Sequence, residues 1–371
     1  MKLRREKKHK KERKSYDISQ SALYNTSSKA KLAAIFSTDI KEVIRCIGDY
    51  RRFELIPELD PFKLGKPPKV RQVQKPAPKL LAIHERTLRL LRCVQVPKYM
   101  QFALKGTSYK NNAEMHLLGK CVATLDIRNF FGSTSKSKVF NFFNGPLKAP
   151  GDVASLYSDL TTFDDCLPTG SPLSPLLSFY ANKALFDDLN IIATEHGLTF
   201  TCYVDDLTFS GESISRRFLW QIENTIRQYG HVVASKKTRF FKDGIPKHIT
   251  GVIVHEGNIR VPNVRYRKMR LIKEAIHGSG KNYGLTRKEL EYKLGGLLGE
   301  AAYLDPSNLP AAIEFGKTSH KIFLKTITSV REYSELPKPS ATDEKFNPPW
   351  HEQELTTMLL PEQANNGNEA D

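Results

Sequence analysis

Two adjacent aspartates in the middle of the chain are the residues best placed to do chemistry. Asp205 and Asp206 separate two runs of strand-forming residues, 200–204 and 207–210. The pattern predicts a hairpin whose two-residue turn is Asp205-Asp206, with two carboxylates side by side at an exposed tip. Aspartate pairs also occur in ordinary turns, because aspartate tolerates turn geometry and hydrogen-bonds to its own backbone. A catalytic role therefore needs a further group nearby.

Asp126 supplies such a group. It stands near the end of an apolar run, 121–127, that is typical of a buried strand. In one sheet, this carboxylate can lie next to the hairpin tip, and three carboxylates around one point suit hard divalent cations. Two Mg²⁺ ions about 3.5–4 Å apart would activate an attacking hydroxyl and stabilise a leaving pyrophosphate. We therefore expect Asp126, Asp205 and Asp206 to be catalytic and metal-binding, with Mn²⁺ able to replace Mg²⁺.

Net charge is the strongest signal in the composition. The 371 residues carry a formal charge of +17, which favours a polyanionic partner. Residues 1–14 hold nine Lys or Arg and two Glu, so this arm is expected to be flexible, either as a solubility tail or as an RNA- or partner-binding tail.

No apolar run approaches the ~20 residues of a membrane span, and no secretion signal is visible, so a cytoplasmic protein is expected. The five scattered cysteines contain no Cys-x-x-Cys pair that would indicate zinc.

Apolar spacing and turn residues predict the elements around the aspartates. The regions 57–79 and 168–175 are rich in Pro or turn residues and are expected to be extended or loop-like. A hairpin is expected over 249–261, with its turn at Glu256-Gly257-Asn258, and residues 265–333 are expected to be mostly helical. Further helices are expected at 39–47, 80–94, 176–189 and 214–229.

The hairpin sequence Tyr203-Val204-Asp205-Asp206, followed by Leu207 to Ser210, resembles the catalytic hairpin of reverse transcriptases, and more closely that of bacterial retron reverse transcriptases. The likeness spans roughly residues 50–335. The segment 124–131 is similar to the first palm motif of the family. By that likeness Asp126 binds metal, and Phe131 stacks under the sugar of the incoming nucleotide and excludes ribonucleotides. Without the motif, Phe131 would more simply be a core aromatic.

Three further segments resemble nucleotide-binding parts of the family. The segment 167–175 is similar to the one that packs against template and incoming nucleotide, although many reverse transcriptases have Gln in place of Thr169; Gly170 allows close backbone approach. Lys237 lies in a segment, 235–238, similar to the lysine motif near the triphosphate. Lys69 and Arg71 fall where the finger bases that hold the triphosphate would lie.

Two short elements point to retrons in particular. Residues 112–116 fit the Asn-Ala-x-x-His element that precedes the first palm motif, through Asn112, Ala113 and His116. Thr250 and Gly251, after Ile249, fit a Val-Thr-Gly element with Ile for Val. Each match alone is short, and a lone His116 is more often structural than functional. Together, in order and at these spacings, the two elements favour the retron type.

The resemblance implies an α+β protein with a right-hand polymerase fold: fingers and palm, in which an antiparallel sheet packs on helices, and a helical C-terminal thumb. The implied division is a basic arm 1–20, N-terminal helices and fingers 21–110, a palm with an inserted finger segment 111–262, a thumb 263–335 and a tail 336–371. The reverse transcriptase domain would span about 50–262. The thumb would contact duplex phosphates through basic residues, around an apolar core of Leu294, Leu297, Leu298, Ala301 and Ala302. Those basic residues are Arg265, Arg267, Lys268, Arg270 and Lys273.

The resemblance also implies an RNA-directed DNA polymerase that uses dNTPs to copy part of a cognate structured noncoding RNA into single-stranded DNA. Synthesis would start from a guanosine 2′-OH, so that the DNA stays joined to the RNA (msDNA). A role in anti-phage defence implies a separate effector (toxin) protein as partner. Two alternatives remain: another bacterial reverse transcriptase, of group II intron or non-retron defence type, and a scaffold that mainly binds RNA and the effector.

Overall fold

The computed structural model describes residues 15–56, 60–62, 70–104 and 106–318. The chain divides into two compact units. We call Met1–Phe53 together with Gln72–Ile259 the sheet unit, and Glu54–Arg71 together with Arg260–Asp371 the helical unit. Residues 1–14 of the expected arm 1–20, the expected tail 336–371 and Lys69 lie outside the described residues. Within those residues, no helix is long and apolar enough to cross a membrane.

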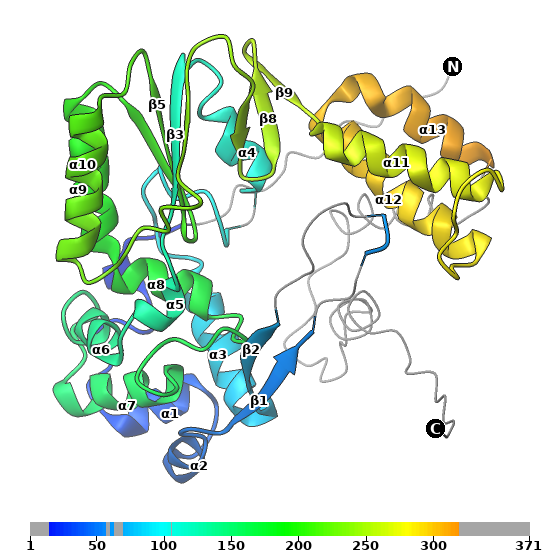
Figure 1. Ribbon diagram of the computed structural model, residues 1–371. Helices are drawn as coiled ribbons and strands as arrows, with labels where there is room; N and C mark the ends of the chain where they lie inside the picture. Colours follow the sequence, from blue (N-terminus) through cyan, green and yellow to red (C-terminus); the bar gives the residue numbers. More distant parts are fainter. Residues whose placement is uncertain (1–14, 57–59, 63–69, 105, 319–371) are drawn as a thin grey trace, which may run out of the picture. The chain divides into compact units, whose positions relative to one another are not determined.

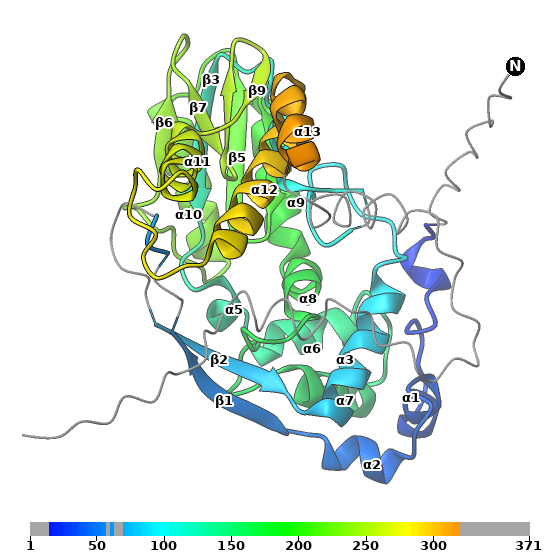
Figure 2. The ribbon, with the colours of Figure 1, turned by 90° about the vertical axis from the view of Figure 1, so that its right-hand side faces the viewer.

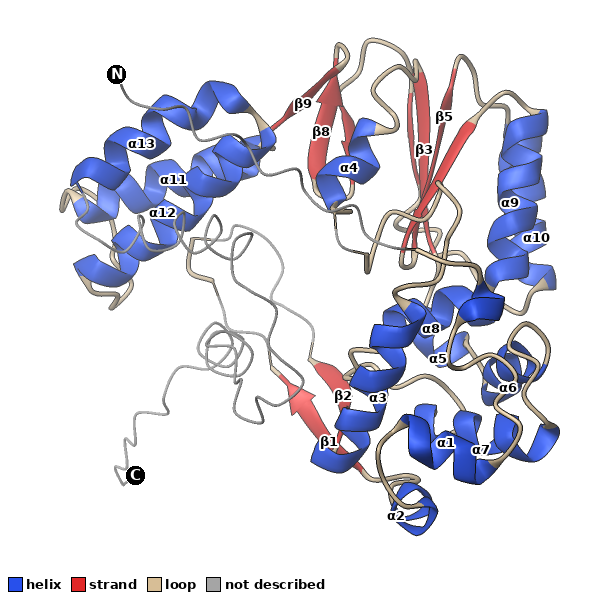
Figure 3. Ribbon diagram, turned by 180° about the vertical axis from the view of Figure 1, so that it is seen from behind, coloured by secondary structure: helices blue, strands red, loops and turns tan. Residues whose placement is uncertain are grey.

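A four-stranded antiparallel sheet lies at the centre of the sheet unit, with the strand order β4-β5-β3-β6. Helices α9 and α10 lie beside this sheet (Figure 1; Figure 3). The ring of Phe218 on α10 meets the ring of Phe209 on β5 edge-on, with centroids 5.3 Å apart. The element bounds are β3 Cys121–Asp126, β4 Thr199–Tyr203, β5 Asp206–Gly211, β6 Arg239–Phe241, α9 Lys183–Glu195 and α10 Arg216–Gln228.

A group of helices forms the other half of the core of the sheet unit. The Phe143 and Tyr157 rings stack with centroids 4.2 Å apart and join α6 to α7, while Phe142 stacks on Tyr180 of α8. These fully or nearly fully buried rings give the helices a common apolar core. The helices are α1 Lys29–Ile35, α2 Ile40–Arg45, α3 Pro78–Leu91, α5 Phe130–Ser133, α6 Lys136–Asn144, α7 Gly151–Thr161 and α8 Ser174–Ala181, after a short 3-10 turn η1 Ile18–Gln20.

The helix expected over 176–189 is two helices. Helix α8 ends and α9 begins at Asn182, whose φ of −118° and ψ of 20° are not helical. The Asn182 side chain donates to the carbonyl of Ser178 at 2.9 Å, so it takes over a backbone acceptor at the break. The apolar spacing continues through residues 176–189, so the sequence pattern did not predict this break.

Short strands complete the β-structure. Strands β1 (Tyr50–Leu55) and β2 (Arg71–Pro76) form a two-stranded sheet. A three-stranded sheet has the order β7-β8-β9, with bounds Lys247–Ile249, Val252–His255 and Asn258–Arg260, and helix α4 (Tyr109–Glu114) precedes β3. The expected hairpin over 249–261 is confirmed as β8–β9, with Glu256 and Gly257 in its turn; β7 and its turn at Thr250-Gly251 were missed.

In the helical unit, α11 (Asn263–Ile276), α12 (Arg287–Leu304) and α13 (Leu309–Thr318) lie side by side, with a 3-10 turn η2 (Pro306–Asn308) before α13 (Figure 2). A reciprocal capping box between Thr286 and Glu289 starts α12. Of the expected core of this unit, Leu294, Leu298 and Ala301 are buried, while Leu297 and Ala302 are partly exposed. The helical pattern expected for this region is confirmed as far as residue 318.

Candidate active site

The strand register places two of the three aspartates opposite each other. In the antiparallel pair β3–β5, Asp126 lies across from Asp206 and Leu125 across from Leu207. Directly opposed residues of neighbouring strands point to the same face of a sheet, about 4.5–5.5 Å apart at Cβ. The two carboxylates therefore share one face at the end of the sheet, while Ala123, Leu125 and Leu207 are buried.

The turn of the hairpin differs from the sequence expectation by one residue. Tyr203 pairs with Asp206, so the two-residue turn is Val204-Asp205, and Asp206 is the first residue of β5. Val204 has a φ of +60°, a left-handed conformation that is unfavourable for a β-branched side chain. The backbone amide of Ile127, just beyond β3, donates to the Asp205 carbonyl at 3.0 Å and holds the turn against the neighbouring strand. Such local strain persists only where the surrounding structure fixes it, and it is concentrated at functional sites.

The carboxylates of this site are partly removed from water and lie near one another. Burial, followed by the negative charges of Asp205 and Asp126, raises the pKa of Asp206 to about 6. Lys237 Nζ donates to Asp126 Oδ2 at 2.6 Å, and this bond, with the other two aspartates, raises the pKa of Lys237. The Lys237 ammonium thus neutralises part of the charge of the acidic cluster.

The donor chemistry of this cluster suits a hard divalent cation, because it consists of carboxylate oxygens, and burial followed by their mutual repulsion raises the pKa of Asp206. Among the described residues, however, no three His, Cys, Asp or Glu side chains converge into a ligand set. In this conformation, the Lys237 ammonium occupies one oxygen of Asp126. The residues therefore fit the ion by charge and atom type, and ion binding requires a movement of their side chains.

A hollow of about 360 Å³ opens beside Asp126 and Asp206. Thr124 and Thr208 also line the hollow. They lie opposite each other on β3 and β5, two residues from Asp126 and Asp206, and therefore point to the same face of the sheet. Lys237, Thr250 and Gly251 are among the lining residues that the sequence singled out. Lys236, from the same 235–238 motif, also lines the hollow. Arg239 and His248 line it too and were not predicted, because the three-residue strands that contain them are too short to show a sequence pattern.

The two retron-like elements meet in the structure. Asn112 Nδ2 donates to Thr250 Oγ1 at 3.3 Å, and Thr250 Oγ1 donates to the carbonyl of Tyr109 at 3.1 Å. Thr250 and Gly251 have φ values of 41° and 86°, and they connect the paired residues Ile249 and Val252. Positive φ at both central residues is the conformation of a type I′ hairpin turn, which suits glycine and is strained for threonine. Asn112 therefore supports a strained turn at the wall of the hollow.

His116 and Ala113 are fully buried. The two ring nitrogens of His116 lie 2.7 Å from Ser210 Oγ on β5 and 2.7 Å from Thr201 Oγ1 on β4. Burial lowers the pKa of His116 to about 3, so the ring is neutral at physiological pH. His116 thus joins the two strands of the β4–β5 hairpin from within the core, and does not line the hollow.

The other expected nucleotide contacts lie elsewhere in the sheet unit. Phe131 is partly buried in α5, and its backbone carbonyl accepts from Leu167 N at 3.2 Å. Thr169 Oγ1 donates to the Gln72 carbonyl and to Gln74 Oε1, each at 3.1 Å. A Cβ on Gly170 would lie 2.7 Å from the Gln74 carbonyl oxygen, so this glycine permits close packing on β2. In this structure, the Thr169 hydroxyl is engaged by β2.

The basic residues expected to bind nucleic acid lie in the helical unit and are described apart from the site. Three of them form ion pairs within that unit: Arg265 with Glu300 at 2.8 Å, Lys268 with Asp60, and Arg270 with Glu274 at 3.7 Å. Arg267 is exposed on α11, and Arg71 is exposed at the start of β2.

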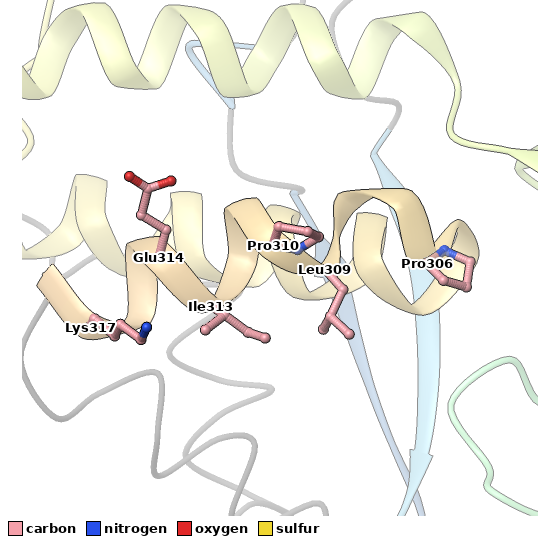
Figure 4. Close-up of a pocket in the computed structure, with 6 residues that line it drawn as sticks. All are labelled: Pro306, Leu309, Pro310, Ile313, Glu314 and Lys317. Atoms are coloured by element: carbon pink, nitrogen blue, oxygen red, sulfur yellow. The ribbon is translucent and has the colours of Figure 1, made fainter.

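A second hollow in this unit is mostly apolar and follows one side of α13, from Pro306 to Lys317 (Figure 4). Its lining includes Glu314 and Lys317 but no cluster of carboxylates.

Comparison with known proteins shows which family this chain resembles. Residues 64–266 match the family described as reverse transcriptase (RNA-dependent DNA polymerase). The retron Ec86 reverse transcriptase of Escherichia coli is 28% identical over 215 residues, covering 56% of this chain and 66% of that protein. The retron Se72 reverse transcriptase of Salmonella heidelberg (strain 579083-10) is 27% identical over 241 residues, covering 62% of each. The retron Mx65 reverse transcriptase of Myxococcus xanthus is 29% identical over 210 residues, covering 50% of this chain and 48% of that protein.

The matched residues thus span less than two thirds of the length of each of these curated relatives. The family match, in contrast, covers more than half of this chain and contains both the strand of Asp126 and the hairpin of Asp205 and Asp206. All three relatives are retron enzymes by name. The chain belongs to the reverse transcriptase family, and its curated relatives are of the bacterial retron type.

Proposed function

We propose that this protein is an RNA-directed DNA polymerase of the retron type. The observation that carries the proposal is the register that sets Asp126 opposite Asp206, with Asp205 in the adjoining turn and Lys237 on Asp126. An arrangement of this kind concentrates negative charge where a nucleotidyl transfer site needs divalent cations, beside a hollow with basic walls. The reverse transcriptase family in general requires a divalent metal.

In this proposal, Asp126, Asp205 and Asp206 hold two Mg²⁺ ions, which Mn²⁺ can replace. When bound, the ions activate the attacking hydroxyl and stabilise charge on the leaving pyrophosphate. Lys237 then provides a positive charge for the triphosphate, because its ammonium already lies at the carboxylate cluster. Phe131 excludes ribonucleotides by a clash with the 2′-OH. Thr169, Gly170, Lys69 and Arg71 remain proposed nucleotide contacts, although Thr169 first has to release its hydrogen bonds to β2.

In this proposal, the sheet unit together with residues 54–71 corresponds to palm and fingers, and the helices from residue 263 onward correspond to a thumb that binds RNA. The proposed bounds are those expected from the sequence: fingers 21–110, palm 111–262 and thumb 263–335. Support comes from the antiparallel sheet, which carries the carboxylates, and from the basic surface of α11, where Arg267 and Arg270 are exposed. The polymerase would act in the cytoplasm.

For the retron type, we propose that the enzyme copies part of a cognate structured RNA into single-stranded DNA. Priming from a guanosine 2′-OH would leave the DNA joined to the RNA, and the complex would act in anti-phage defence with a separate effector protein. The retron names of the relatives support this reading. The contact between the two retron-like elements, through Asn112 and Thr250, supports it as well.

Primer extension on an RNA template tests the polymerase activity. The double variant Asp205→Asn, Asp206→Asn is expected to lose about 10³-fold or more of the rate with Mg²⁺. Asp243→Asn is the matched control, because Asp243 is an exposed aspartate on a turn after β6. Full activity in the double variant would refute the metal assignment. A folded wild-type chain that binds RNA but extends no primer would favour the scaffold alternative.

The retron type is tested by isolating the protein from cells that carry its native flanking locus and digesting the bound nucleic acid with RNase. A discrete single-stranded DNA with a residual 2′-linked ribonucleotide is expected. Primer extension without such DNA would identify a reverse transcriptase of another kind.

A further inference from the structure

Lys138, on α6, has a half-buried ammonium group held by three neutral acceptors. Its Nζ donates to Asn182 Oδ1 at 2.9 Å, to the Tyr229 carbonyl at 2.6 Å and to His231 Nε2 at 2.6 Å. A lysine ammonium has three N–H donors, so these contacts use all of them. None of the three acceptors is a carboxylate, although buried charges are usually paired with an opposite charge. The ammonium therefore organises a polar network.

One arm of this network runs through His231. Because Nε2 accepts from Lys138, the ring proton belongs on Nδ1, which donates to Ser133 Oγ at 2.7 Å. Ser133 Oγ in turn donates to the Phe130 carbonyl at 3.2 Å. His231 Nε2 also lies 2.8 Å from Asn182 Oδ1, and in this assignment both atoms accept from the same ammonium. His231 is only 1% exposed, so water does not compete for these bonds.

The second arm runs through Asn182, at the break between α8 and α9. Asn182 Nδ2 donates to Thr134 Oγ1 at 3.0 Å, and Thr134 Oγ1 donates to the Phe130 carbonyl at 2.9 Å. The same Nδ2 donates to the Ser178 carbonyl, which orients the amide so that Oδ1 faces Lys138. Both arms therefore start at one ammonium and end at one carbonyl oxygen.

Helix α5, which contains Phe130, depends on such support. It has only four residues, and a helix of one turn is not stable by itself in water. Its N-cap residue, Asn129, has a left-handed φ of 49° and makes no capping hydrogen bond with its side chain. The orientation of α5 is therefore set by tertiary contacts. Phe131, the proposed sugar gate, follows Phe130 directly in this helix.

The same network also anchors the chain between α10 and Lys237. Tyr229 and His231 lie just after α10, and two backbone bonds connect the following residues to the end of β3. Arg128 N donates to the Val232 carbonyl and Ala234 N to the Asp126 carbonyl, each at 2.8 Å. Lys138 thus connects the helix of Phe131 with the segment that carries Lys237.

We propose that Lys138 is a positioning residue that fixes α5, and with it the Phe131 ring, for deoxynucleotide binding and for the exclusion of ribonucleotides. The inference rests on the proposed polymerase function. Lys138 acts through His231, Ser133, Asn182 and Thr134, and its own ammonium does not need to touch the nucleotide.

The protonation states of the two titratable groups agree with these roles. Burial, and after it the positive charge of Lys138, lowers the pKa of His231 to about 4, so the imidazole is neutral at pH 7 and able to accept. Burial lowers the pKa of Lys138 to about 8, which leaves the ammonium mostly protonated at pH 7. The donor and the acceptor of their bond are therefore both in the required form.

The main test compares Lys138→Met with Lys136→Met in the full chain. Lys136 lies on the same helix, but its Nζ pairs with Asp159 at 2.5 Å, outside the network. In primer extension on an RNA template, Lys138→Met is expected to raise the KM for a dNTP about 10-fold and to lower discrimination against the matching ribonucleotide about 10-fold. Its kcat should stay within about threefold of wild type. Lys136→Met should leave all three quantities unchanged.

Two milder variants separate the arms and protect the test against a failure of Lys138→Met to fold. Ser133→Ala removes the His231 arm, and Thr134→Val removes the Asn182 arm. Each variant alone should raise the KM for the dNTP about threefold. In the Lys138→Met background, each should raise this KM little further, because both arms start at the Lys138 ammonium. Full additivity in these double variants would contradict a common origin at Lys138.

Hydrogen exchange of peptides covering residues 129–135 provides a readout that needs no catalysis. Exchange should be faster in Lys138→Met than in wild type and Lys136→Met. Unchanged exchange, together with a dNTP KM and sugar discrimination within about twofold of the control, would overturn the proposal. If the wild-type chain extends no primer, the proposed polymerase function fails, and hydrogen exchange alone decides whether Lys138 fixes α5.

Discussion

The sheet unit and the helical unit use charged residues in different ways. At the end of the sheet, Asp126 is buried and Asp206 is partly buried, and burial together with the neighbouring carboxylates raises the pKa of Asp206 to about 6. In the helical unit, the pairs of Arg265 with Glu300 and Arg270 with Glu274 lie at partly or fully exposed positions. In the first region, removal of a charge from water has a high free-energy cost, so each charge depends on its particular neighbours. Exposed charges interact weakly one by one and act mainly through their total number. Single substitutions should therefore have large effects in the sheet unit and small ones in the helical unit.

The largest effect is expected for Asp206→Asn, which should reduce primer extension about 10³-fold or more and at the same time stabilise the fold. The raised pKa means that the native state binds more protons than the unfolded state between about pH 4 and 6, so stability falls as pH rises through this window. The variant lacks this loss and should be more stable at pH 7 by about 1–2 kcal/mol. Below about pH 4, the gain should disappear.

Urea unfolding at pH 7 and pH 4, without divalent cations, measures this difference. Asp243→Asn, at an exposed position, should change neither activity nor stability. A loss of stability at pH 7 in Asp206→Asn would contradict the raised pKa of Asp206.

The next largest effect is expected for Phe131→Ala. If Phe131 blocks the 2′-OH, its removal should raise ribonucleotide incorporation about 10- to 100-fold relative to the dNTP. Competition between the two nucleotides on one RNA template measures the ratio. Phe140→Ala, at another partly buried phenylalanine of the sheet unit, serves as the control. Unchanged sugar selectivity would remove the gate assignment.

The next prediction compares how the loss of a buried and of an exposed histidine changes the stability of the fold. His116→Ala removes a fully buried ring that bonds to Ser210 and Thr201, and it should lower the free energy of unfolding by about 2–4 kcal/mol. His277→Ala changes an exposed residue at the end of α11 and should alter stability by less than about 0.5 kcal/mol. Urea unfolding gives both values. Equal effects would show that the retron-like histidine does not join the hairpin strands.

The smallest effect is expected for Arg267→Ala, at an exposed position on α11. Binding of the cognate RNA should weaken only a few-fold, and the slope of log K against log salt should decrease by about 1, as for the loss of one phosphate contact. Titration of RNA at several salt concentrations measures the slope. Loss of all RNA binding from this one change would mean that the helical unit recognises RNA through a specific contact, against the expectation for exposed charges.

The order and type of the main elements, and the three aspartates, could be predicted from the sequence by itself. Apolar strands around Asp126 and Asp206 have local patterns, and local patterns need no knowledge of distant contacts. The family motifs are local as well, and they indicated Asp126, Asp206 and Lys237, which line one hollow in the structure. The turn was shifted by one residue, because strand propensity does not distinguish Val204-Asp205 from Asp205-Asp206 once a valine accepts a φ of +60°.

Only the tertiary structure decided which side chains meet. The bond of Lys237 to Asp126 joins residues far apart in the chain, and so do the contacts of Asn112 with Thr250 and of Lys138 with His231. The break at Asn182 became visible only through its side-chain bonds to Ser178 and Thr134. Long-range hydrogen bonds and buried charges depend on which groups the folded chain removes from water together, and no local pattern of residues records that.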